Sequence, residues 1–113
     1  MSAVRISRRR DFKIQSATGR DFSPQGPALA YQLEVCIEGD LQEKTGMLMN
    51  IRDLDTILQL TLKEFENKAT AHATPALAQE LFNKIRPSIT LHNARLLRVR
   101  LKENDDLWYD VWA

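Results

Sequence analysis

The sequence predicts an α+β fold in which two helices pack against one face of a four-stranded sheet. Residues 29–37 alternate apolar and polar side chains, which is typical of a half-buried strand. Two later stretches, 51–66 and 75–86, carry apolar side chains at helical spacing, and the last third of the chain returns to strand-like alternation. The predicted order of elements is therefore strand, strand, helix, helix, strand, strand.

The first strand is predicted over residues 4–16, and its pattern is mixed. One face combines apolar side chains with cations: Ile6, Arg8, Arg10, Phe12 and Ile14. This pattern predicts a strand that is half exposed or is completed in an assembly. Turn-forming residues then predict a loop over 17–27.

Both helices carry signals at their ends. Asn50 is a predicted N-cap, and Asp53 places a carboxylate in the first turn, at the positive end of the helix dipole. Thr74 and Pro75 form a comparable start for the second helix. We expect Pro87 to end that helix, because proline lacks the N–H that the next helical hydrogen bond needs.

The last third of the chain predicts a pair of strands. Leu97, Val99 and Leu101 alternate with basic residues, so one face of this strand is apolar. An acidic turn at 104–106 separates it from a short aromatic strand over 107–112. We expect the apolar face to rest on the helices.

Composition and charge exclude several classes of protein. The chain carries 16 basic and 15 acidic residues, a net charge of +1, which excludes a polyanion binder driven by bulk charge. No apolar stretch is long enough to cross a bilayer, and no secretory signal peptide is visible. Because Cys36 is the one cysteine, no internal disulfide forms, and we expect a single domain over residues 1–113 in the cytoplasm.

Charged side chains lie on the strand faces that turn away from the helices. Glu34 and Glu38 share one strand, and Arg98, Arg100 and Lys102 share another. One interpretation is a solvated face with cross-strand ion pairs, each worth roughly a few tenths of a kcal/mol. The other is that this face lines the polar interior of an oligomeric barrel, because closing a ring of subunits removes the exposed sheet edges.

Three segments match one protein family in order and spacing: LEVCIEGDLQEKTGMLMNIRDL over 33–54, a helix closing on Arg86-Pro87, and Val99-Arg100-Leu101-Lys102-Glu103. The chain resembles the 6-pyruvoyltetrahydropterin synthase / 6-carboxytetrahydropterin synthase family. The resemblance implies the tunnelling fold, a ββααββ chain with a four-stranded antiparallel sheet and two helices on one face, which assembles into an oligomeric β-barrel. It also implies a homo-oligomer, trimer or hexamer, with sites between subunits.

The sequence departs from this family at the metal site. Family members hold zinc with three histidines, and the resemblance aligns these positions with Ser16, Pro27 and Leu29. Proline and leucine side chains offer no donor atom, and a serine hydroxyl is a poor zinc ligand at neutral pH. We therefore expect no zinc and no other cofactor.

The family's catalytic groups are missing as well. The catalytic cysteine falls on Ser23, where a hydroxyl without a general base is a feeble proton acceptor. The aspartate–histidine pair falls near Glu66 and Asn67, and an asparagine cannot titrate. The acid that opens the second helix is absent from residues 73–75. We expect no catalytic residue.

Two histidines and one cysteine lie elsewhere. We expect His72 and His92 to be surface residues near the ends of elements, the alternative being a metal shared between them across a subunit interface. Cys36 lies on the charged face of its strand and is expected to be inert rather than a nucleophile.

Glu103 is the part of the family's site that persists. The resemblance implies that this carboxylate anchors a pterin by accepting paired hydrogen bonds from the 2-amino group and a ring N–H. A carboxylate matches a planar edge with two donors in this way. The alternative is an exposed acid at a strand end, beside the acidic turn.

Two further clusters each have two interpretations. The basic cluster consists of Arg5, Arg8, Arg9 and Arg10. We expect a solvated face there, with nucleic-acid binding as the alternative. The aromatic cluster consists of Trp108, Tyr109 and Trp112. It either packs against another subunit or forms a stacking platform for a flat ring.

The sequence thus predicts a divergent 6-pyruvoyltetrahydropterin synthase-like protein without zinc-dependent lyase activity. We expect it to bind a pterin-like or purine-like ring through Glu103 as a homo-oligomer, with no membrane and no nucleic-acid partner. Two alternatives stay open. One is a pterin-processing enzyme with metal-free catalysis, and the other is an interaction module whose basic first strand contacts a protein or a nucleic acid.

Overall fold

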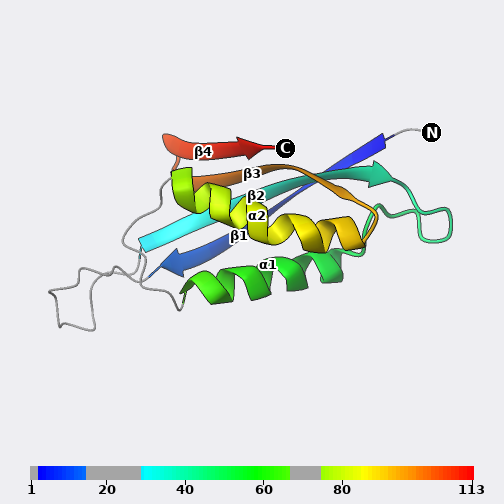
Figure 1. Cartoon of the computed structure of the whole chain (residues 1–113), viewed down its shortest axis with the longest axis horizontal. Coiled ribbons are helices and arrows are strands. Elements are labelled where there is room, and N and C mark those ends of the chain that lie inside the picture. The colour runs from blue at the N-terminus through cyan, green and yellow to red at the C-terminus, as the bar shows by residue number, and fades with distance from the viewer. Residues whose placement is uncertain (1–2, 15–28, 67–74) are drawn as a thin grey trace, which may run out of the picture.

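A computed structural model of the chain describes residues 3–14, 29–66 and 75–113 (Figure 1). The elements are, in order, β1 (Ala3–Ile14), β2 (Leu29–Asp40), α1 (Ile51–Glu66), α2 (Pro75–Leu91), β3 (Arg95–Asn104) and β4 (Leu107–Trp112). This is the predicted order. None of the helices in the described part of the chain has the length and apolar content that a bilayer span requires.

The four strands form one antiparallel sheet in the order β1-β2-β3-β4. Both helices lie side by side on the same face of this sheet, α1 along β1 and α2 along β3 (Figure 1). The predicted α+β architecture is therefore confirmed. Within the described residues, β1 and β4 form its two edges, and the opposite face of the sheet carries no helix.

The alternation of β2 determines where the core lies. Its inward side chains Tyr31, Leu33, Val35 and Ile37 are buried, whereas the residues between them are only partly covered. The helices contribute the buried side chains Leu54, Leu58, Leu62, Phe65, Leu77, Ala78, Leu81, Phe82, Ile85 and Ile89. Burying one large apolar side chain contributes about 1.5–3 kcal/mol, so this shared surface holds both helices on the sheet.

The start of α1 is the predicted one. The side-chain oxygen Oδ1 of Asn50 accepts a hydrogen bond from the backbone N–H of Arg52 at 2.9 Å. The backbone carbonyl of Asn50 accepts the first helical bond from the N–H of Leu54 at 3.1 Å. Such an N-cap typically contributes about 1 kcal/mol, because it satisfies a donor that the helix leaves free.

The predicted end of α2 at Pro87 is wrong, because the helix continues to Leu91. Pro87 is exposed, so its ring lies on the outer side of the helix, while Ile89 is fully buried and anchors the last turn in the core. Two residues after the end of the helix, Asn93 adopts a positive φ of 59°, the left-handed conformation that commonly follows a helix. Packing of the last turn therefore outweighs the one helical hydrogen bond that proline removes.

The predicted alternation of β3 also needs a correction. Ile37 of β2 pairs with Leu96 and Cys36 pairs with Arg98, so Leu97 is an extra residue in a β-bulge. Leu96 is 1% exposed and takes the inward position that we expected for Leu97, which is only partly buried. Because of the bulge, even-numbered Leu96 points inward before it, whereas odd-numbered Val99 and Leu101 point inward after it.

Candidate functional site

Glu103 lies at a second bulge in β3. Lys102 pairs with Trp108, and the next pair along the hairpin is Asn104 with Leu107. Glu103 is therefore an extra residue with no direct partner on β4. A bulge redirects a side chain relative to the regular pleat. The half-buried carboxylate of Glu103 reaches Tyr109 on the neighbouring strand.

Tyr109 holds one oxygen of this carboxylate. Its hydroxyl donates a hydrogen bond to Oε2 of Glu103 at 3.3 Å. Burial, the negative charge and hydrogen bond of Glu103, and the nearby Tyr31 all raise the pKa of Tyr109. A raised pKa keeps the hydroxyl protonated and therefore a donor. Among the described residues, Oε1 of Glu103 has no hydrogen-bond partner and stays available as an acceptor.

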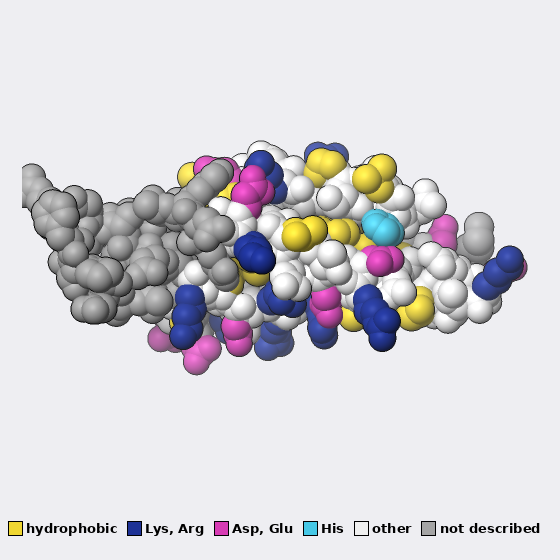
Figure 2. All heavy atoms as spheres, turned by 90° about the horizontal axis from the view of Figure 1, so that it is seen from below, with side chains coloured by type: hydrophobic (Ala, Val, Ile, Leu, Met, Phe, Trp, Pro, Cys, Tyr) yellow, Lys and Arg dark blue, Asp and Glu magenta, His cyan; other side chains and the backbone are white. Residues whose placement is uncertain are grey.

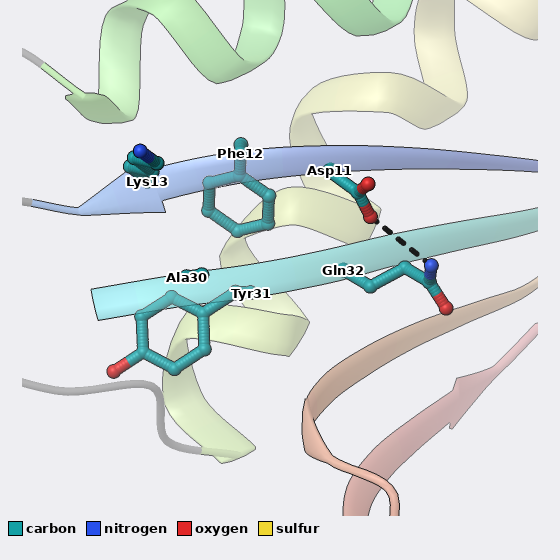
Figure 3. A pocket seen from close by; sticks show the side chains of 6 residues that line it. All are labelled: Asp11, Phe12, Lys13, Ala30, Tyr31 and Gln32. Atoms are coloured by element: carbon teal, nitrogen blue, oxygen red, sulfur yellow. Dashed lines mark hydrogen bonds between the residues drawn. The ribbon is translucent and has the colours of Figure 1, made fainter. Parts of the chain in front are cut away.

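Two aromatic side chains line a cavity near this end of the sheet. Phe12 of β1 lies opposite Tyr31 of β2, with ring centroids 5.8 Å apart and ring planes inclined by 43°. The cavity has a volume of about 440 Å³, and its lining residues are Asp11, Phe12, Lys13, Ala30, Tyr31 and Gln32 (Figure 3). Glu103 does not line it but lies one strand away, because Gln32 pairs with Lys102.

The sequence pattern predicts Tyr31 and Phe12 only as strand residues. Each is 4% exposed, so both belong to the core as well as to the cavity wall. The signal that points to the cavity is the hydroxyl of Tyr31, which brings a polar atom to the edge of the core. No aliphatic residue in that position would do so.

Ion pairs cover the helix-free face of the sheet. Glu34 of β2 accepts hydrogen bonds from Arg98 and from Nε of Arg9, the latter at 3.1 Å. Glu38 accepts one from Arg95, and Nε of Arg5 lies 3.9 Å from its carboxylate. Cross-strand ion pairs are therefore present as predicted, and they also involve β1, which the prediction did not include.

The basic cluster of β1 divides between the two faces of the sheet. Arg5 and Arg9 belong to the ion pairs just described, whereas Arg8 turns toward α1. Its guanidinium donates two hydrogen bonds to the carboxylate of Asp55, at 2.8 and 2.9 Å. These bonds lower the pKa of Asp55. Within the described residues, Arg10 alone of the four arginines has no ion-pair partner. Figure 2 shows cations and carboxylates interspersed on one face of the molecule.

The aromatic residues of β4 do not form one platform. Trp108 and Trp112 lie exposed on the helix-free face, where guanidinium groups cover their rings. The Cζ atom of Arg100 lies 5.2 Å from the Trp108 ring centroid, and that of Arg98 lies 5.4 Å from the Trp112 centroid. Tyr109 lies partly buried on the helix-covered face. The expected cluster is therefore split between two surfaces.

The positions that the resemblance aligns with the family's zinc ligands and catalytic groups lie mostly beyond the described ranges. These are Ser16, Ser23, Pro27, Asn67 and residues 73–74, and His72 lies beyond them as well. Leu29 begins β2, and a leucine side chain has no donor atom for zinc. His92 lies with Nδ1 4.0 Å from Oδ2 of Asp53, and Cys36 is a half-buried thiol on β2. In the described ranges, no three His, Cys, Asp or Glu side chains group as a metal site would require.

Comparison with known proteins agrees with this arrangement. The family model described as 6-pyruvoyl tetrahydropterin synthase matches residues 29–113. The structure is similar to that of Caenorhabditis elegans 6-pyruvoyl tetrahydropterin synthase, with a TM-score of 0.75 at 17% sequence identity. That match covers 100% of this chain and 97% of the other, and it confirms the tunnelling fold of the subunit. No curated protein sequence matches the chain.

Proposed function

Because the chain belongs to the 6-pyruvoyl tetrahydropterin synthase family, we propose that it binds a pterin-like or purine-like ring through Glu103 without zinc-dependent lyase chemistry. The proposal includes a homo-oligomer, a trimer or a hexamer, in the cytoplasm. It also treats residues 1–113 as one domain.

The geometry of Glu103 carries the proposal. The half-buried carboxylate of Glu103 lies at a bulge, and the hydroxyl of Tyr109 donates a hydrogen bond to one of its oxygens. A carboxylate held in one plane accepts two parallel hydrogen bonds from the amino group and ring N–H of a pterin or guanine edge. Because the side chain is already ordered, less conformational entropy is lost when the ring binds.

The neighbouring aromatic residues supply a surface for the rest of such a ring. Phe12 and Tyr31 line the cavity of about 440 Å³ one strand away from Glu103. This volume falls within the range of roughly 300–1,000 Å³ that small-molecule sites occupy. An aromatic wall beside a carboxylate is the combination that a flat ring with one polar edge requires.

The side chains at the family's zinc positions support binding without metal chemistry. Leu29 and Pro27 have no donor atoms, and one serine hydroxyl does not hold zinc at neutral pH. The chemistry of Tyr109 also favours binding over metal-free catalysis. A general base works best when its pKa lies near the operating pH, and the surroundings of Tyr109 move its pKa upward, away from neutrality.

The sheet edges support an assembly. In the part of the chain that the structure describes, β1 and β4 each pair on one side only, and long exposed edges promote pairing with another chain. Joining such edges in a ring leaves the ion-paired, helix-free face on the inside. A polar inner face is what a barrel large enough to enclose water requires.

A fluorescence titration with neopterin in the presence of a chelator tests the proposal. We expect saturable binding by the wild-type protein and a loss of at least roughly tenfold in affinity for Glu103→Gln, which keeps the shape but removes the charge. Asp106→Asn, an exposed acid in the same hairpin, is the matched control and is expected to bind like wild type. Equal affinity of Glu103→Gln and wild type removes Glu103 from the site.

Metal analysis of the purified protein tests the second part of the proposal, the absence of zinc-dependent lyase chemistry. We expect no stoichiometric zinc and no lyase turnover of a dihydropterin triphosphate. One bound zinc per chain, together with turnover that a chelator stops, overturns the proposed loss of metal chemistry.

A further inference from the structure

A polar hollow lies between β1 and α1, and Asp11 is the one lining residue that it shares with the cavity of the proposed ring site. Its volume is about 210 Å³, and it is lined by Arg10, Asp11, Gln59, Leu62 and Lys63. We propose that this hollow binds a phosphate-type oxyanion. The inference does not depend on the ring site, and either can fail without the other.

β1 and α1 form an ion pair at one level of their contact but not at the next. On β1, Arg8 is followed on the same face by Arg10, and on α1 the residue one turn after Asp55 is Gln59. Arg8 and Asp55 neutralise each other through two hydrogen bonds. One turn further along α1, Gln59 stands in place of a carboxylate, so Arg10 has no ion-pair partner among the described residues and acts on Asp55 only through space.

Lys63 adds a second cation to the same hollow. It follows Gln59 by one further turn of α1 and therefore projects from the same side of the helix. Among the described residues, neither Arg10 nor Lys63 forms an ion pair. Two like charges that line one small hollow repel each other, and an anion between them relieves this repulsion.

Asp11 does not supply the missing negative charge. Its Oδ1 accepts a hydrogen bond at 3.1 Å from Nε2 of Gln32 on β2, and Figure 3 draws its carboxylate turned toward that residue. Asp55, one turn earlier on α1, is hydrogen-bonded to Arg8, and the charge of Arg10 makes a smaller contribution at that carboxylate. Buried Leu62 also lines the hollow and gives it an apolar wall.

The donor set indicates the class of anion. A guanidinium presents a planar fork that binds two oxygens of a phosphate, and an ammonium contributes a point charge. The amide of Gln59 adds an N–H donor. Lys63 lies in the last turn of α1, so its charge also offsets the partial negative charge of the helix end. Two cations are too few for the extended contacts that a nucleic-acid backbone makes.

Titration of the full chain with inorganic phosphate, followed by backbone NMR at constant ionic strength in chloride, tests the site. We expect saturable shifts at Arg10, Gln59 and Lys63, and affinity at least roughly tenfold lower in Arg10→Gln and in Lys63→Gln. A parallel titration with a phosphate monoester, glycerol 3-phosphate, distinguishes a free ion from an esterified phosphoryl group. Saturable binding of either at these residues supports the site.

The matched control is Lys44→Gln, which removes an exposed cation outside the hollow and is expected to change affinity less than roughly twofold. Thermal melting of each variant verifies that it is folded. Shifts that stay linear, or that spread over all exposed basic residues, overturn the proposal. So does wild-type affinity in both Arg10→Gln and Lys63→Gln.

Discussion

The hydroxyl of Tyr109 donates a hydrogen bond to Oε2 of Glu103 over 3.3 Å, from β4 to the bulge in β3. The two residues are six positions apart, on the two strands of one hairpin. The turn between them therefore fixes their distance. A local hairpin thus orients the one carboxylate on which the proposed ring site depends.

Tyr109→Phe tests this orienting role. The substitution keeps the ring but frees the carboxylate, so we expect neopterin affinity to fall by about threefold to tenfold, as for loss of one hydrogen bond. Trp108→Phe, on the opposite face of β4, is the control and is expected to bind like wild type. Fluorescence titration measures both. Unchanged affinity in Tyr109→Phe would show that Glu103 needs no support from Tyr109.

The Arg100–Asp110 pair predicts a specific pH dependence of stability. The two hydrogen bonds from Arg100, at 2.8 and 3.0 Å, lower the pKa of Asp110. A lowered pKa in the folded state means that the pair stabilises the fold above the ordinary aspartate pKa. This contribution disappears as the pH falls through the lower folded-state pKa.

Asp110→Asn removes this contribution. We expect a lower melting temperature than wild type at neutral pH, and a difference that shrinks as the pH is lowered into the acid range. Asp105→Asn, whose side chain is fully exposed, is the control. Thermal denaturation by circular dichroism over a pH series measures the effect. A constant difference between Asp110→Asn and wild type at every pH contradicts the assignment.

Gly39 packs closely against the end of the Leu48 side chain. A Cβ atom at this position would lie 2.3 Å from Cδ1 of Leu48, which is itself buried. We therefore expect Gly39→Ala to lower the free energy of unfolding by about 1 kcal/mol, because the end of Leu48 must shift to make room. Asp40→Ala, at the exposed next position, is expected to change it little. Chemical denaturation measures both variants, and a Gly39→Ala protein as stable as wild type would contradict this account of the packing.

We expect Pro87 to lower the free energy of unfolding, because it lies inside α2. Pro87→Ala restores an N–H that bonds to the carbonyl one turn earlier, but it also releases entropy in the unfolded chain. We expect a net gain of about 1–2 kcal/mol in the free energy of unfolding. Pro75→Ala, at the first helical position, is the control, because no N–H is needed there. A loss of stability in Pro87→Ala would show that the ring is needed for packing.

Local signals in the sequence explain what could be predicted. The alternation over 29–37 and the cap at Asn50 depend on neighbouring residues alone, and both have the expected structure. The prediction that α2 ends at Pro87 is wrong because the continuation of the helix depends on the burial of Ile89 in the core. A local rule for proline does not include that contact.

The candidate site was predictable only in part. Glu103 was found through a family resemblance, but its partner Tyr109 was assigned to an aromatic cluster. The two bulges of β3, at Leu97 and Glu103, decide which side chains point inward, and they arise from pairing with β2 and β4. Register between strands is a property of the folded sheet, so alternation within one strand does not reveal it.

A crystal structure of the protein soaked with neopterin tests the central claim most directly. The account predicts that the ring binds with its amino group and ring N–H within hydrogen-bond distance of the Glu103 carboxylate, with Tyr109 still in contact with that side chain. It also predicts no metal ion beside the ring. A ring bound away from Glu103, a ring held by a zinc ion, or no bound ring at all would contradict the account.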